Sequence, residues 1–235
     1  MIRKLFIVFA SGLVLGILLL SSAWVLGGPE AVRRIEEKGG LSLHHKRGKS
    51  AETTKSFPLG DLREMRIDLP LDLRFVRGEA GTIEITGPQA LVGSLDWQDG
   101  RLRKAKGWTL DGDGITVTVT AREIPALRLD APADVELEGL DQPSLDIELA
   151  GAGDIDASGK AGKVRIVSRG AGDIDLSKLD TADAVLRIEG VGDIDVNASG
   201  TVDAAIEGAG TVSLHRKPKV LTTRISGIGS VDHDY

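Results

Sequence analysis

The chain of 235 residues contains no cysteine. Disulfide bonds, cysteine-ligated metal sites, thiol nucleophiles and a lipid-modified N-terminal cysteine are therefore excluded. Aromatic residues make up only 3% of the sequence, whereas hydrophobic residues reach 41% and glycine occurs 30 times. A core built from valine, isoleucine and leucine with few bulky rings favours a thin, repetitive β architecture.

The sequence also lacks the short motifs of common active sites. The zinc-protease motif H-E-x-x-H, the hydrolase motif G-x-S-x-G and the phosphate-binding motif G-x-x-x-x-G-K are absent. The segment Gly151-Ala152-Gly153 begins like a dinucleotide-binding fingerprint, but the third glycine is missing and no helix is expected after it. We therefore predict that the protein is not an enzyme and has no resident cofactor.

Only one long hydrophobic run is present, at the N-terminus. Arg3 and Lys4 precede an uncharged run from residue 5 to residue 28, which is typical of an export signal. Small residues at 21–23 favour cleavage, whereas the length of the run, enough to span a bilayer core of about 30 Å, favours a retained anchor. Residues 1–28 are predicted to be a signal peptide or a signal-anchor helix. The rest of the chain is then extracytoplasmic, in a bacterial cell envelope, either anchored on the periplasmic side or released into the periplasm.

Charge is unevenly distributed along the chain. The formal net charge is −6, and a negative body repels phosphate backbones, so nucleic acid is not an expected partner. Residues 29–56 instead carry seven basic and four acidic side chains and show no apolar periodicity. We predict that this segment is a charged linker. It is either a solvated tether or a basic patch that contacts anionic lipid beside the membrane.

From Phe57 onward, apolar and polar residues alternate, which is typical of β-strands with one buried face. Residues 57–235 are therefore predicted to form one β domain. Its first part, residues 57–124, has turns at irregular intervals and is expected to be an irregular β region. No helix is expected after the linker.

Residues 125–235 contain a repeat built around the pattern Gly-x-Gly-Asp-x-Asp. The clearest copies start at residues 151, 170 and 190, and degenerate copies start at 131, 208 and 227, so the spacing is 18 to 20 residues. Apolar residues recur at fixed positions on both sides of the glycine pair, so the same strand parity points inward throughout. A unit of about 19 residues is too short for a strand–helix–strand crossover but fits one coil of a parallel β-solenoid. Ile155, Ile174 and Ile194 are predicted to stack in one column.

These Gly-Ala-Gly-Asp-Ile-Asp units, preceded by an alternating N-terminal part, resemble the bacterial head GIN domain, a family named for an auto-transporter adhesin head. The resemblance extends over residues 57–235 and is looser between Thr86 and Ala121. It implies a right-handed β-solenoid in an envelope protein with an adhesin-like or surface-binding role.

Stacking of the coils places the outward-facing aspartates of the repeat in two rows. Carboxylates about 4.8 Å apart repel one another, so an offsetting interaction is expected. Two remain open: hydrogen bonds from backbone N–H groups at the glycine bend, and bridging Ca²⁺, a hard cation that takes carboxylate ligands. The candidate Ca²⁺ ligands are Asp154, Asp156, Asp173, Asp175, Asp193 and Asp195.

We predict a non-catalytic envelope solenoid that acts as an adhesin-like or surface-binding module toward an envelope protein or a polysaccharide. One alternative is a regulatory or sensory accessory domain that acts on a membrane partner, for which the basic linker and the N-terminal segment argue. The other is a polysaccharide-cleaving β-helix enzyme, because paired carboxylates perform glycoside hydrolysis. Against the enzyme, each candidate aspartate is a repeat element with no unique arginine, lysine or histidine beside the central rows.

Overall fold

The computed structural model describes residues 51–104 and 114–235. They belong to one compact unit, Lys49–Tyr235. The signal or anchor segment 1–28 and most of the predicted linker lie outside the described residues. No helix in the described ranges has the length and hydropathy of a transmembrane span.

Nearly all regular structure in this unit is β-strand. In chain order the elements are β1 (Glu52–Pro58), β2 (Met65–Ile67), β3 (Leu71–Arg77), β4 (Thr82–Pro88), α2 (Gln89–Gly93), β5 (Leu95–Gln98), β6 (Arg101–Lys104), β7 (Thr116–Ala121), β8 (Ala126–Leu129), β9 (Ala133–Leu149), β10 (Ile155–Ser168), β11 (Ile174–Ile188), β12 (Ile194–Ala198), β13 (Thr201–Ile206), β14 (Ala209–Leu214), β15 (Val220–Ile225) and β16 (Ile228–His233). The predicted all-β class is confirmed. Strand β1 begins inside the segment 29–56 that was expected to be linker.

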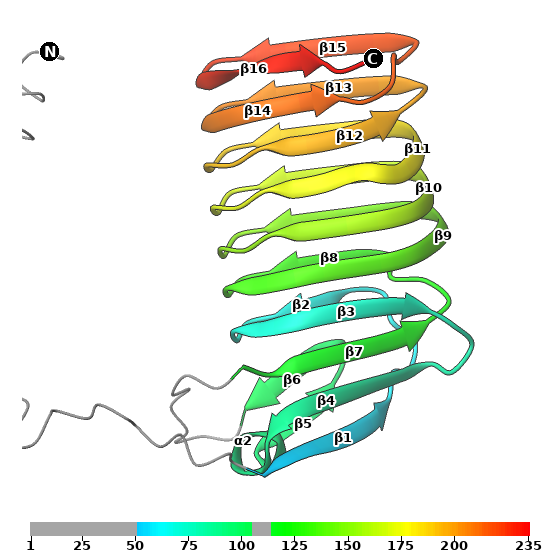
Figure 1. Ribbon diagram of the computed structural model, residues 1–235, viewed down its shortest axis with the longest axis vertical. Coiled ribbons are helices and arrows are strands. Elements are labelled where there is room, and N and C mark those ends of the chain that lie inside the picture. The colour runs from blue at the N-terminus through cyan, green and yellow to red at the C-terminus, as the bar shows by residue number, and fades with distance from the viewer. Residues whose placement is uncertain (1–50, 105–113) are drawn as a thin grey trace, which may run out of the picture. The chain divides into compact units, whose positions relative to one another are not determined.

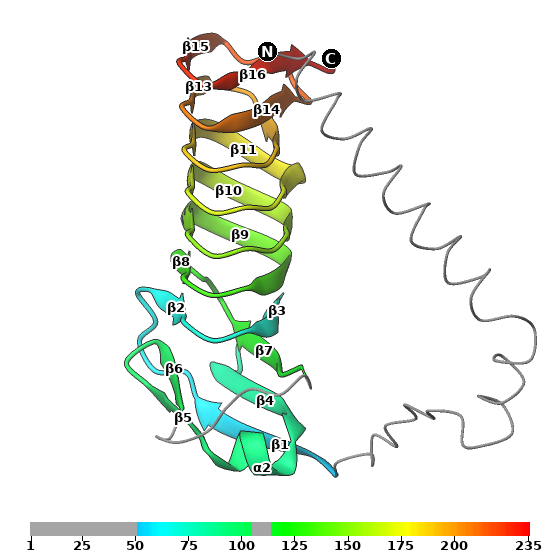
Figure 2. The same ribbon diagram turned by 90° about the vertical axis from the view of Figure 1, so that its left-hand side faces the viewer.

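The strands stack as a parallel β-solenoid of about five turns (Figure 1). Each coil crosses two faces, which the Gly-x-Gly bend joins at one side (Figure 2). We call face 1 the surface formed by the strand segments that come after the bend along the chain. It is made by β3, residues 133–137 of β9, 155–157 of β10, 174–176 of β11, and β12, β14 and β16. We call face 2 the surface formed by the strand segments that come before the bend. It is made by β2, β8, residues 144–149 of β9, 163–168 of β10, 183–188 of β11, and β13 and β15.

The register of the coils is the one that the repeat predicts. Ile155 pairs with Ile174, and Ile174 pairs with Ile194, so the three side chains form one column inside the solenoid. Each is 1% exposed. The column continues through Val135 on one side and Val212 on the other. Because strand side chains alternate with a period of two, this register buries the apolar parity of every central coil. The right-handedness that the resemblance implies stays a prediction.

The expectation of an irregular region over 57–124 is incomplete, because part of it continues the solenoid. Strand β3 lies between β7 and β9 in parallel register, and β2 pairs with β8. The chain then leaves the stack through β4 to β6 and returns at β7. Strands β1, β4 and β7 pair antiparallel and close this end of the domain.

The expectation that no helix follows the linker is wrong at one short element. Helix α2 begins directly after Pro88, whose φ of −55° suits a helix start. Its Leu91 and Val92 are buried against the core. A helix of five residues is too short to show a helical period in the sequence. An isolated helix of this length is also not stable in water, so its packing against the β1 end of the domain decides the conformation.

Candidate functional site

The outward-facing side chains of face 1 form two rows that run along the solenoid axis. Row A is the first polar position after the glycine bend, and it holds Asp72, Asp134, Asp154, Asp173, Asp193, Thr211 and Ser230. Row B lies two residues further along each strand, and it holds Arg74, Glu136, Asp156, Asp175, Asp195, Ser213 and Asp232. The structure therefore brings all six predicted aspartates onto one face, three in each row.

Row A is a ladder of side chain to backbone hydrogen bonds. The backbone N–H of Asp173 donates to Oδ1 of Asp154 at 3.0 Å, and the N–H of Asp193 donates to Oδ1 of Asp173 at 2.9 Å. The ladder continues to Asp134 at one end and to Thr211 at the other. Each bond joins one coil to the next. A carboxylate that accepts an amide hydrogen is stabilised, and this offsets repulsion between neighbouring aspartates.

The glycine bend sets the position from which these amides donate. Gly153, Gly172 and Gly192 have φ values of +136°, +141° and +142°, a region that side-chain-bearing residues rarely adopt. The N–H of Gly172 donates to the carbonyl oxygen of Val191 in the next coil at 3.1 Å. The bend therefore holds successive coils in close backbone contact, and the aspartate that follows it meets its neighbour at hydrogen-bond distance.

The carboxylates of row B accept fewer hydrogen bonds than those of row A. Partial burial acts to raise the pKa of Asp175, but hydrogen bonds from the side chain and backbone of Ser177 outweigh it and hold the pKa below its usual value. The backbone bond, from Ser177 N–H to Oδ1, is 2.8 Å long. Arg74 lies 3.6 Å from Glu136, and the His215 ring lies 2.8 Å from Asp195. Lys178 lies beside the middle of the row, where its charge also lowers the pKa of Asp175. Within the described ranges, neither Asp156 nor Asp175 forms an ion pair.

Face 2 has a different character, because most of its carboxylates are paired with arginines across coils. Arg128 contacts Glu148 at 2.7 Å, and Arg165 contacts Asp146 at 3.1 Å. Asp203 lies between two arginines and accepts hydrogen bonds from both. The bond from Arg187 is the main reason why the pKa of Asp203 is held below its usual value.

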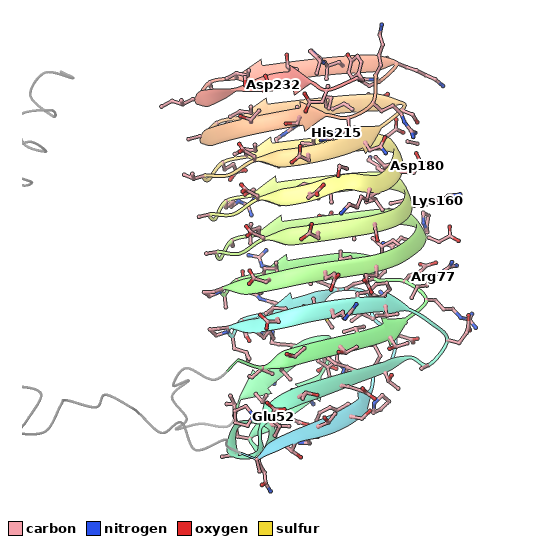
Figure 3. All side chains as sticks on the ribbon, viewed as in Figure 1. Glu52, Arg77, Lys160, Asp180, His215 and Asp232 are labelled. Carbon is pink, nitrogen blue, oxygen red and sulfur yellow. The ribbon has the colours of Figure 1, made fainter. Side chains whose placement is uncertain are left out.

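The curved side opposite the bend is also mixed in sign. Arg77, Lys160 and Asp180 lie along it (Figure 3). Arg77 contacts Asp141 at 3.0 Å, and Asp180 contacts Arg216 at 2.6 Å. Unpaired negative charge is therefore concentrated on face 1.

Two shallow grooves lie on face 1, side by side along the axis. One has a volume of about 480 Å³ and is lined by Asp72, Arg74 and Asp134 among others. The second, of about 420 Å³, is lined by Asp156, Asp175 and neighbouring residues. Both grooves are open and share Glu136 and Asp156, so they are recesses of one surface, in which carboxylates outnumber the cations Arg74 and Lys178.

The sequence reasoning missed Asp72 and Arg74, which extend rows A and B below the first repeat. The sequence contains a pattern from which both could have been predicted. The segment Leu71-Asp72-Leu73-Arg74 shares the alternation of Ala133-Asp134-Val135-Glu136, but it lacks the Gly-x-Gly pair. In the described part of the chain, no three histidine or carboxylate side chains converge as a metal site.

We expect the Asp173→Ala variant to lower the free energy of unfolding by about 1 kcal/mol, the usual net value of one hydrogen bond. The reason is the loss of the acceptor for the N–H of Asp193. Denaturant unfolding of the variant beside the wild type measures the difference. Asp173→Asn is the matched control, because its side-chain oxygen can still accept that bond, and we expect a smaller loss.

Thermal unfolding with and without Ca²⁺ separates backbone bonding from a cation site. If the ladder is held by hydrogen bonds alone, millimolar Ca²⁺ leaves the melting temperature unchanged. A rise of several degrees that disappears when Asp154, Asp173 and Asp193 are all changed to asparagine would instead assign these residues to Ca²⁺, because a ligand that binds only the folded state stabilises it.

The family model described as "Putative auto-transporter adhesin, head GIN domain" matches residues 61–218. The chain belongs to this family. The matched range includes β3, β9, β10, β11 and β12, and so both carboxylate rows from Asp72 to Asp195. The resemblance inferred from the repeats is confirmed.

Solved structures share the fold of this chain. A protein from Bacteroides fragilis described as a putative adhesin has a TM-score of 0.63 at 21% identity, over 78% of this chain and 97% of its own. A second putative adhesin, from Parabacteroides distasonis, has a TM-score of 0.50 at 19% identity, over 79% of this chain and 98% of its own. At this level of identity the likeness shows the fold alone. No curated protein matches the chain.

Proposed function

We propose that this head GIN domain is a non-catalytic binding module of the cell envelope, and that face 1 is its contact surface for a partner that carries spaced positive charges. The observation that supports the proposal most directly is the separation of charge between the faces. The carboxylates of rows A and B lie in register over successive coils. On face 2, in contrast, Asp146, Glu148 and Asp203 are paired with arginines.

The geometry of face 1 suits an extended partner. Successive coils repeat at the spacing of paired strands, about 4.8 Å, so row B offers carboxylates at regular intervals along a rigid surface. A rigid array loses little conformational entropy when a partner binds. A partner with lysine, arginine or amino-sugar groups along its length can contact several coils at once, and the attraction weakens with added salt.

The charges of face 1 also argue against a hydrolase. A glycoside hydrolase needs one carboxylic acid whose pKa is raised, so that it remains protonated and can donate to the leaving group. On face 1 the pKa of Asp175 is shifted the other way, and Asp173 is held by a backbone amide. The adhesin names of the family and of its structural neighbours agree with a binding role, and surface exposure of the domain is part of the same proposal.

The test is binding of the full chain in detergent to isolated envelope fragments. A variant with Asp156, Asp175 and Asp195 all changed to asparagine removes three charges from row B and leaves the bonds of row A in place. We expect its apparent dissociation constant to rise at least about tenfold, since charge complementarity of this kind is worth several kcal/mol across an interface. Wild-type binding should also weaken with increasing salt.

A matched control changes the same number of charges elsewhere. Asp61→Asn, Asp96→Asn and Glu123→Gln lie on exposed positions outside face 1. We expect this control to bind like the wild type. An equal loss of affinity in both triple variants would mean that net charge alone explains the binding. No loss of affinity in either variant would refute face 1 as the contact surface.

A further inference from the structure

The last coil of the solenoid leaves its core side uncovered. Among the described residues, β15 pairs only with β13, and β16 pairs only with β14. Side chains at core positions are exposed here: Ile225 is 48% exposed, whereas Ile206 and Ile188, which precede it in the same column, are 0% exposed. We call this surface the end surface and define it by the edges of β15 and β16 with the core-position side chains Leu221, Thr223, Ile225 and Val231.

The two ends of the solenoid differ. At the other end, the sheet becomes antiparallel at β4, and its last strand, β1, carries Lys55 and Pro58, two residue types that block strand addition. Helix α2 packs Leu91 and Val92 into the core there. The end surface has neither protection, since no proline and no lysine lies within β15 or β16. A second copy of the chain therefore cannot continue the stack through its β1 end.

We propose that two copies of this chain associate through their end surfaces, related by a two-fold axis. The end surface itself is the one open solenoid end in the described part of the chain, so an isologous contact is the one that satisfies both partners. Such a contact closes on itself as a dimer and does not propagate into a filament. Any two-fold axis across this end brings the edge strands together antiparallel, and each copy supplies the backbone donors and acceptors that the other lacks.

The side chains of β15 restrict the register. Directly opposed residues of an antiparallel pair point to the same side, so core positions must face core positions. A pairing centred on Thr223 does this: Leu221 lies opposite Ile225 of the second copy, and Thr222 lies opposite Arg224. A pairing centred on Arg224 would place two guanidinium groups opposite one another, which is unfavourable.

Strand β16 restricts the axis further, and the two strands together leave one. A pairing centred on Val231 places Ser230 opposite Asp232 of the second copy, whereas a pairing centred on Asp232 would oppose two carboxylates. Thr223 and Val231 lie at equal distances in sequence from Gly227, at the bend between β15 and β16. One axis, perpendicular to both faces, therefore passes through both centres.

This axis has a consequence for face 1. A two-fold rotation about the normal of a face leaves that face on the same side, so the acidic faces of the two copies join into one surface of twice the length. The dimer itself does not depend on the function proposed above. Where that function holds, the dimer presents two binding surfaces to one extended partner, and the affinity rises through the second, intramolecular contact.

The absence of native cysteine makes the test direct, because a single introduced cysteine reports one position. We expect Thr223→Cys and Val231→Cys, each made in the full chain in detergent, to cross-link to dimers on mild oxidation or with a short bis-maleimide. Opposed residues in an antiparallel pair have Cβ atoms about 5 Å apart, within reach of such a linker. Ser56→Cys, on an exposed position of β1, is the matched control and should remain monomeric.

A charge on the axis should abolish the contact. In the Val231→Cys chain, Thr223→Lys places two lysines opposite one another, and we expect the dimer dissociation constant to rise at least about tenfold. Ser56→Lys in the same chain should leave cross-linking unchanged, and circular dichroism checks that every variant keeps its β structure. The proposal is overturned if Thr223→Cys cross-links no more than Ser56→Cys, or if Thr223→Lys leaves the Val231→Cys dimer intact.

Discussion

The Gly172→Ala variant is expected to lower the free energy of unfolding by about 3 kcal/mol or more, the range of a strained backbone combined with overpacking. A Cβ at this position would lie 2.8 Å from the carbonyl carbon of Gly153 in the preceding coil, and closer still to its oxygen. The φ of +141° adds strain, because a residue with a side chain rarely adopts it. Relief of the overlap would separate these two coils and lengthen the bond from Gly153 N–H to the carbonyl oxygen of Ala171, which is 3.0 Å long and joins them.

Denaturant unfolding, followed by the β signal in circular dichroism, measures this loss. Gly93→Ala is the matched control, because a Cβ there meets no atom within 4 Å and its φ is not positive. We expect that control to be neutral or slightly stabilising, since alanine restricts the unfolded chain. Similar stability of the Gly172→Ala variant and the wild type would mean that the bend is not held in the close coil contact described above.

The Ile174→Ala variant is expected to lower the free energy of unfolding by about 3 to 4 kcal/mol, as removal of a fully buried isoleucine side chain does in other cores. Ile174 is 1% exposed and lies between Ile155 and Ile194 in the central column. Strands fix the backbone on both sides of it, so the cavity cannot collapse easily and its full cost remains.

Val191→Ala provides the comparison for this loss. Val191 is 60% exposed at the tip of the bend, and its truncation should change stability by less than about 0.5 kcal/mol. The contrast between two apolar residues of the same repeat tests which positions face inward. A loss below 1 kcal/mol at Ile174, or a larger loss at Val191, would contradict the inward register.

Much of the solenoid was predictable because two local rules coincide. The alternation of side chains across a strand and the return of Gly-x-Gly every 18 to 20 residues place Ile155, Ile174 and Ile194 at equivalent positions. A one-residue slip between coils would turn their side chains outward, so burial of the apolar parity leaves one register. The observed pairing of these three residues follows from the sequence alone.

The N-terminal part was less predictable because its contacts are distant in sequence. Leu73 pairs with Val135, although β4 to β8 separate them along the chain. Alternation identifies β3 as a strand, but it contains no information about which strand lies beside it. The same holds for α2, whose conformation depends on burial of Leu91 and Val92.

The candidate site was likewise predictable only in part. The sequence placed six aspartates on the outward parity of one face, but it left open whether backbone amides or a cation would offset their repulsion. The bond from Asp193 N–H to Asp173 depends on how closely successive coils approach at the bend, which is a tertiary distance. The pairing of Arg187 with Asp203 on face 2 is tertiary in the same sense, since it joins side chains of adjacent coils.

The sequence by itself therefore determined the repeat, the coil length, the inward parity and the acidic rows, because each follows from side-chain alternation and from the glycine positions. Only the tertiary structure decided that β3 extends those rows, that most carboxylates of face 2 are paired with arginines while the central carboxylates of row B are not, and that no described residue covers the last coil. These features depend on which strands become neighbours. That choice is made by burial over the whole domain, and no local pattern of residues encodes it.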